Sequence, residues 1–148
     1  MRNYRGGVAI AALALLAAVT FASGRAVAEG AIAVGVAPGG VQHGYAIGFA
    51  LNAADEAAAR VTSVNACHKS TGSNVAAQSR CEAVATFHNQ CASSALDPAN
   101  GTPGAGWGIG DTQKDADALA MERCRNTAGP TRRQFCVVED RHCDGDAK

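Results

Sequence analysis

The chain contains 148 residues, in which 13 Lys and Arg balance 13 Asp and Glu. A chain without net positive charge and without a Lys/Arg stripe gives no support for nucleic-acid binding, which depends on the neutralisation of phosphates. The length is that of one domain.

The first 28 residues have the order of a secretory signal peptide. Arg2 and Arg5 precede an apolar run at 8–21, and Ala26-Val27-Ala28 forms a small-x-small cleavage site. The run is shorter than the roughly 18 apolar residues that a membrane span needs. We therefore expect cleavage after Ala28, export to the periplasm, the cell envelope or the medium, and no stable membrane span afterwards.

The exported part, residues 29–148, is expected to be a single disulfide-stabilised domain, and its first half combines strand and helix patterns. We expect strands at 31–36, 45–50 and 81–87, a helix at 52–68 that Asn52 caps, and an exposed loop at 69–80. In the second strand the large Tyr45, Ile47 and Phe49 alternate with small residues. One face of this strand can therefore fill a core, while the other permits close approach of another backbone.

The same order of elements recurs in the second half. We expect strands at 92–96, 105–110 and 135–138, a turn at 97–103, a helix that Thr112 caps, and a mobile tail at 144–148. Adding 61 to the residue number maps Ala31 onto Ala92 and Tyr45 onto Gly106. The repeat halves are about 31–90 and 91–143. The predicted fold class is α+β: two strand–strand–helix–strand repeats that form a mostly antiparallel sheet with two helices packed on it, cross-linked by disulfides.

Glycine occupies every second position around Trp107, at Gly104, Gly106, Gly108 and Gly110. The spacing is not that of a dinucleotide-binding motif, which needs its third glycine three residues after the second and a strand before the loop. Glycine inside a strand marks a place where another backbone or a ligand comes close. We favour a closely packed helix or strand over a ligand at this face.

Several segments resemble a family of bacterial secreted domains, the domain-of-unknown-function family numbered 4189. The matching residues are Ala31-Ile32-Ala33, Cys67, the segment from Cys81 to Ala92, Trp107-Gly108, the segment from Ala116 to Cys124, and Cys136-Val137-Val138. The resemblance covers essentially the whole exported part. It implies an exported α+β domain with disulfides, and it implies no settled activity.

All six cysteines lie in the exported part, where an oxidising compartment favours pairing. Six cysteines allow fifteen connectivities. If both repeats are built alike, the cysteine at each helix end reaches the following strand, which predicts Cys67–Cys81 and Cys124–Cys136. The remaining pair, Cys91–Cys143, would tie the end of one repeat to the end of the other. The segment 81–96 would then be the junction that holds the halves together.

A zinc site is the rival use of these cysteines, because His68, His88 and His142 lie close to them in sequence. No Cys-x-x-Cys pair occurs, although close ligand pairs of this kind are typical of structural zinc sites. We therefore expect no metal ion and no other cofactor.

The sequence contains no Gly-x-Ser-x-Gly motif, and the cysteines are assigned to disulfides. Asp115, Asp117 and Glu122 are expected on the solvated side of a helix. His43 and His88 are the first candidates for a catalytic base, but a Gly-rich turn and a strand end account for their positions better. No catalytic residue is therefore assigned.

We predict a binding module that acts in the cell envelope or outside the cell on an unknown protein or envelope component. A secreted hydrolase of unrecognised type is the alternative. The residues most suited to a binding contact are Trp107, Tyr45, His43 and His88, although core packing is the favoured role of the aromatic ones.

Overall fold

The computed structural model describes residues 29–148, and the predicted signal peptide at 1–28 lies outside the described residues. The elements in chain order are β1 (Glu29–Val36), β2 (Tyr45–Ala53), α1 (Glu56–His68), α2 (Val75–Gln78), β3 (Glu82–Phe87), β4 (Cys91–Leu96), β5 (Ala105–Gly110), α3 (Gln113–Ala128) and β6 (Val137–Cys143). Short 3₁₀ turns lie at Val41–His43 and Arg133–Phe135.

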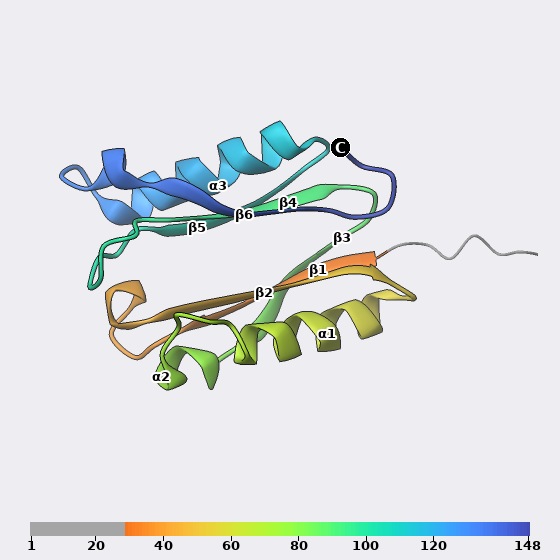
Figure 1. Ribbon diagram of the computed structural model, residues 1–148, viewed down its shortest axis with the longest axis horizontal. Coiled ribbons are helices and arrows are strands. Elements are labelled where there is room, and N and C mark those ends of the chain that lie inside the picture. The colour runs from red at the N-terminus through yellow and green to blue at the C-terminus, as the bar shows by residue number, and fades with distance from the viewer. Residues whose placement is uncertain (1–28) are drawn as a thin grey trace, which may run out of the picture.

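The elements form four layers (Figure 1). One antiparallel sheet has the strand order β2-β1-β3 and the other has the order β5-β4-β6. Helices α1 and α2 cover the outer face of the first sheet, α3 covers the outer face of the second, and the inner faces of the sheets lie against each other. The predicted α+β class with disulfides is confirmed. The strands form two sheets where one sheet was expected, because each central strand pairs only within its own half.

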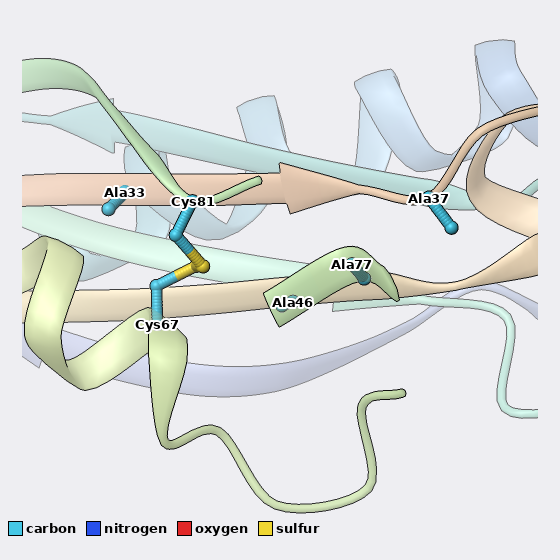
Figure 2. Close-up of a cluster of buried hydrophobic side chains, with 6 residues drawn as sticks. All are labelled: Ala33, Ala37, Ala46, Cys67, Ala77 and Cys81. Carbon is cyan, nitrogen blue, oxygen red and sulfur yellow. A yellow bond between two sulfur atoms is a disulfide. The ribbon is translucent and has the colours of Figure 1, made fainter. Parts of the chain in front are cut away.

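The outer faces of the sheets are built from very small residues. Figure 2 shows Ala33, Ala46 and Ala77 around the Cys67–Cys81 disulfide, where α1 and α2 lie on β1 and β2. A Cβ atom on Gly108 would lie 2.5 Å from the carbonyl oxygen of Ala116. The helix backbones therefore rest directly on the sheets, which confirms that the glycines of β5 face a helix.

The inner faces carry the large apolar side chains. One cluster joins residues of both sheets: Ile32, Val34, Ile47, Phe49, Leu51, Phe87, Ala92, Trp107 and Ile109. These side chains alternate along each strand with the small residues of the outer face. The large residues thus pack sheet against sheet, and the small ones pack sheet against helix.

The two halves correspond residue by residue with an offset of 60 in their paired strands. Val36 pairs with Tyr45 in the first sheet, and Leu96 pairs with Ala105 in the second. The sequence alignment with an offset of 61 was wrong by one residue. A slip of one position moves every side chain of a strand to the opposite face, so that alignment matched Tyr45 of an inner face with Gly106 of an outer face.

All six cysteines form disulfides, in the three pairs predicted from the sequence: Cys67–Cys81, Cys91–Cys143 and Cys124–Cys136. The predicted role of the second pair was wrong, because Cys91 in β4 and Cys143 in β6 are paired neighbours in one sheet. Each disulfide therefore lies within one half. The junction between the halves carries the chain from β3 to β4 and contributes no cross-link between the sheets.

A buried carboxylate joins the two halves instead. Asp144, which is fully buried, accepts hydrogen bonds from the backbone N–H groups of Asn52 (2.6 Å) and Asn89 (3.4 Å). Both asparagines have positive φ angles, 53° and 49°. The backbone N–H of Gly145 also donates to the side chain of Asn52 (3.1 Å). Asp144 is thus an anchored residue, and the prediction that the tail is free from this point was wrong.

Three local details also differ from the sequence prediction. Helix α1 is capped by Asp55, whose side chain accepts from the backbone N–H of Ala58 (2.8 Å), whereas Asn52 still belongs to β2. The expected loop at 69–80 contains the short helix α2. Strand β6 continues to Cys143 instead of ending at Val138. The predicted cap of the second helix, Thr112, is confirmed.

The contact between α3 and β5 predicts that one added methyl group destabilises the protein. Gly108→Ala is expected to lower the free energy of unfolding by about 1–3 kcal/mol, because the new Cβ forces the helix backbone away from the sheet. Urea unfolding without reductant measures the change. Lys114→Ala, on the exposed side of the same helix, is the control and is expected to stay within about 0.5 kcal/mol of the wild type.

Asp144 gives a second prediction. Asp144→Ala leaves two backbone N–H groups without their acceptor and is expected to lower the free energy of unfolding by about 1–3 kcal/mol. Asp146→Ala removes the same charge from an exposed position in the same tail and is expected to have almost no effect. Equal stability of the two variants in urea titrations would contradict the anchoring role.

Candidate functional site

An open pocket of about 540 Å³ runs along the edge strands β2 and β6 of the two sheets and also touches α1; we call it the inter-sheet pocket. Its walls include Tyr45 and Phe49 from β2, and Glu139, Asp140 and His142 from β6. The loop at 70–73 contributes hydroxyl groups to its lining. Aromatic, acidic and hydroxyl groups therefore meet in one cavity.

Tyr45 has an unusual environment in this pocket. Its hydroxyl group is buried and has no hydrogen-bond partner among the described residues. Burial raises the pKa of this hydroxyl above its ordinary value, and the nearby carboxylates of Glu139 and Asp140 raise it further. The phenol is thus held in its neutral form and keeps an unused hydrogen-bonding capacity.

Glu139 occupies a β-bulge of β6. Ser94 of β4 is opposite Asp140 and Ala95 is opposite Val138, so Glu139 has no partner residue in the sheet. Its side chain forms no hydrogen bond or ion pair with the residues that the structure describes. Burial, and then the charge of Asp140, raise the pKa of Glu139 above its usual value. This carboxylate lines the pocket without a positive charge to offset it.

The neighbouring acid, Asp140, is held in place by β4. Its carboxylate accepts a hydrogen bond from the hydroxyl of Ser94 (2.9 Å), and its backbone N–H donates to the same oxygen (3.2 Å). Ser94 is fully buried. This pair fixes the position of one carboxylate in the wall of the pocket.

Arg141 follows these acids in sequence, but its side chain lies on the opposite face of the sheet, towards α3. Arg141 donates from Nε to Asp117 of α3 (2.8 Å). Burial opposes the ionisation of Asp117, but hydrogen bonds from Ser93, Arg141 and Gln113 outweigh it and hold the pKa of Asp117 below its usual value. Arg141 is therefore committed to the helix side and does not neutralise Asp140.

An aromatic contact lies beside the two acids. The ring of His142 in β6 lies 4.6 Å from the ring of Phe49 in β2, with an angle of 48° between their planes. This contact spans the two sheets. Both residues line the inter-sheet pocket together with Glu139 and Asp140.

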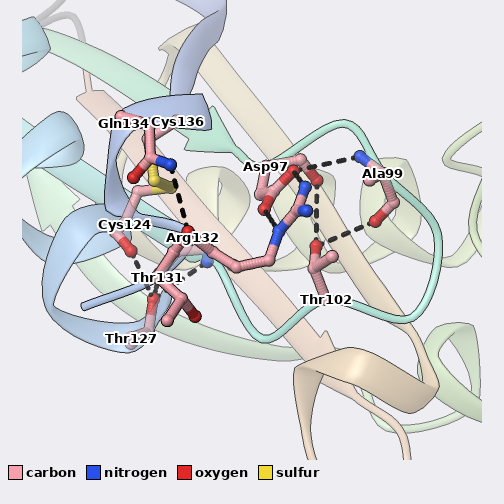
Figure 3. Close-up of polar contacts among 10 residues, drawn as sticks. Asp97, Ala99, Thr102, Cys124, Thr127, Thr131, Arg132, Gln134 and Cys136 are labelled. Atoms are coloured by element: carbon pink, nitrogen blue, oxygen red, sulfur yellow. Dashed lines mark hydrogen bonds and ion pairs between the residues drawn. A yellow bond between two sulfur atoms is a disulfide. The ribbon is translucent and has the colours of Figure 1, made fainter. Parts of the chain in front are cut away.

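A second pocket of about 480 Å³, the end pocket, adjoins the first and shares Tyr45 and Glu139 with it. Its outer wall includes the loop after β4, which Figure 3 shows. There Asp97 accepts two hydrogen bonds from Arg132 (2.5 and 2.8 Å), and these bonds lead the effects that hold the pKa of Asp97 below its usual value. The charge of Asp97 is therefore already compensated, unlike that of Glu139.

The four residues predicted for binding do not all come together. His43 lies exposed in the end pocket with Tyr45. Trp107 lines a third, more apolar groove of about 370 Å³ that also reaches Tyr45, and the guanidinium of Arg123 lies 4.3 Å above its ring. His88 follows β3 near Glu29, at the opposite end of β1 from His43. Tyr45 is thus common to all three hollows, whereas His88 is remote from them.

The strand of the other half that corresponds to β6 is β3, and the offset of 60 between the central strands defines the match. His142, opposite Ala92, corresponds to Ala85, which is opposite Ile32. Asp140, opposite Ser94, corresponds to Glu82, which is opposite Val34. The two bulges lie at different positions of their strands, so the backbones of β3 and β6 differ here.

The sequence analysis missed Glu139, Asp140 and His142 because it ended the last strand at Val138. Two signals were available. The segment from Val137 to Cys143 has the length of a complete strand and ends at a cysteine, and its alternate residues Val138, Asp140 and His142 become more polar along the chain.

Among residues 29–148, no helix has the length and apolar character needed to cross a membrane. Within the same range, no three residues of the His, Cys, Asp and Glu types converge in a way that suits a metal ion.

A family model described as "Domain of unknown function (DUF4189)" matches residues 30–143. Searches among curated proteins and among solved structures found no significant match.

The environment of Tyr45 predicts that removal of its hydroxyl group does not destabilise the protein. Tyr45→Phe is expected to leave the free energy of unfolding unchanged or to raise it by up to about 1 kcal/mol, because no hydrogen bond is lost. Ser94→Ala is the matched comparison: it removes a buried hydroxyl that donates to Asp140, and a loss of about 1 kcal/mol is expected. Urea titrations compare the variants. A loss in Tyr45→Phe as large as that in Ser94→Ala would show that the phenol has a partner.

Proposed function

The chain belongs to the family described as Domain of unknown function (DUF4189), and from this premise we propose that it is an exported binding module whose ligand lies in the inter-sheet pocket. The ligand is a component of the cell envelope or of the medium. The protein holds this ligand and does not transform it.

The observation that carries this proposal is the set of unused polar groups in the pocket. The hydroxyl of Tyr45 is buried and has no partner among the described residues, and the exposed carboxylate of Glu139 forms no hydrogen bond or ion pair with them. A buried polar group such as this phenol costs free energy when it makes no hydrogen bond, so natural proteins keep few of them. A ligand that bonds to these groups recovers part of that free energy.

The frame around the pocket supports the same role. The walls come from β2 and β6, and β6 is fixed to the centre of its sheet by Cys91–Cys143. The loop at 70–73 lies between Cys67 and Cys81, which a disulfide joins. Binding loses less conformational entropy when the walls are held in place before the ligand arrives.

The hydrolase alternative draws no support from the two histidines first considered for it. His43 and His88 lie at opposite ends of β1, and His88 lines none of the three hollows described above. A general base and a nucleophile must lie within hydrogen-bond reach of one another. The two histidines therefore do not belong to one site, and His88 lies outside the inter-sheet pocket.

The test is a pair of variants that block the pocket or leave it open. Thr71, an exposed residue of the loop that lines the pocket, is replaced by Trp to fill it, and the exposed Thr131 is replaced by Trp as the control. A small-molecule library is screened by thermal unfolding. A ligand at one hundred times its Kd stabilises the folded state by about 2.7 kcal/mol, which raises Tm by on the order of 10 °C in a domain of this size.

We expect hits that shift the wild type and Thr131→Trp equally and that do not shift Thr71→Trp. Ligands that stabilise both tryptophan variants alike would place binding outside the inter-sheet pocket. Turnover of a library compound by the wild type, with loss of turnover in Thr71→Trp, would support the hydrolase alternative.

A further inference from the structure

The inter-sheet pocket has negative charge in its walls and no cation to balance it. Neither this pocket nor the end pocket has a Lys or an Arg in its lining, as far as residues 29–148 are concerned. Arg141 donates a hydrogen bond to Asp117, and Arg132 donates hydrogen bonds to Asp97. Glu139 and Asp140 are therefore the two pocket carboxylates without a paired Lys or Arg.

The raised pKa of Glu139 has the same origin. Burial and the charge of Asp140 both disfavour its ionised form, and no positive group counters them. A cation placed between the two carboxylates would reverse this balance. The charge pattern thus favours a positive ligand over a neutral one and opposes a negative one.

The remaining groups of the pocket suit the same kind of ligand. Phe49 and Tyr45 present aromatic rings, which attract cations to their faces. The oxygen of the Tyr45 hydroxyl has no donor directed at it, so it can accept a hydrogen bond from a protonated nitrogen. Hydroxyl oxygens of Ser70, Thr71 and Ser73 add further acceptors at the rim.

We propose that the inter-sheet pocket selects a small organic cation, an alkylammonium or guanidinium group on a short apolar chain, held by Glu139, Asp140 and the oxygen of Tyr45 with its chain against Phe49. This proposal rests on the proposed binding function and adds the chemical class of the ligand. A free amine and the side chain of a lysine in a peptide present the same chemistry.

The test uses probes that share one five-carbon chain and differ in charge. N-acetylcadaverine carries one ammonium group, N,N′-diacetylcadaverine is neutral, and 6-acetamidohexanoate is an anion. Isothermal titration calorimetry at low salt measures their affinities for the protein from residue 29 onward, with its disulfides formed. N-acetylagmatine tests the guanidinium form, and Nα-acetyl-lysine methylamide tests the amine on a peptide unit.

We expect the ammonium probe to bind at least tenfold more tightly than the neutral one, and the anion not to bind. Glu139→Gln and Asp140→Asn are each expected to weaken the ammonium probe by about two- to fivefold, the range of a partly exposed ion pair. Asp146→Asn, which removes an exposed charge outside the pocket, is the control and should leave its affinity unchanged. Added salt should weaken binding, because it screens the attraction.

Tyr45→Phe separates ligand contact from structural support. If the phenol oxygen accepts from the ligand, this variant loses affinity for the ammonium probe while its free energy of unfolding is unchanged or higher. A purely structural role would change stability and leave the affinity of the folded protein as it was. Asp140→Asn keeps the acceptor for Ser94, so its fold is checked by the same urea titration.

Other outcomes would overturn the cation proposal. Equal affinity of the neutral and ammonium probes, or no effect of either carboxylate variant, would refute it. If no cationic probe binds while library compounds stabilise the wild type but not Thr71→Trp, the ligand class is wrong and the binding function stands. If no compound of either set binds or stabilises the wild type more than it does Thr71→Trp, both proposals fail.

The source of the ligand follows from two of the probes. Preference for Nα-acetyl-lysine methylamide over N-acetylcadaverine would assign the ligand to a peptide, and the reverse preference would assign it to a free amine.

Discussion

The contact between helix backbone and sheet is the constraint on which the rest of the structure depends. Gly48, Gly106 and Gly108 leave no room for even a methyl group between strand and helix. Such close packing leaves no space for large side chains on the outer face of each sheet. The apolar area that stabilises the protein must then come from the inner faces, where Ile32, Phe49 and Trp107 meet. The four-layer arrangement follows, because each inner face is covered only when the sheets lie against each other.

The disulfides connect elements within each half, whereas the hydrogen bonds of Asp144 connect the two halves. The three disulfides fix helix to strand or strand to strand inside each half. The halves are joined by the chain between β3 and β4, by apolar contact, and by Asp144 with its two backbone donors. Apolar contact is not directional, whereas a hydrogen-bonded carboxylate is. Asp144 therefore contributes to the register of one sheet against the other at that end of the protein.

The sequence predicted local features well because they depend on neighbouring residues. Alternation of size in Tyr45 to Ala50 fixed which side chains share a face, and the repeat predicted the cysteine pairs. The number of sheets depends on which strands pair across long distances, and alternation does not encode this. The Asp144 anchor was out of reach for the same reason, since its partners are up to 92 positions away in sequence. The pocket was missed through the last strand, where Asp140 and His142 interrupt the apolar pattern expected of an inner face.

That interruption bears most directly on the binding proposal. The carboxylates of Glu139 and Asp140 repel one another, and desolvation adds to the cost of ionising Glu139. The lining of the inter-sheet pocket and the end pocket holds no Lys or Arg that would offset these charges, within residues 29–148. The unpartnered hydroxyl of Tyr45 lies in the same lining, on the facing strand of the other sheet. The proposal follows because these groups have interactions that a ligand can complete and that the described residues do not.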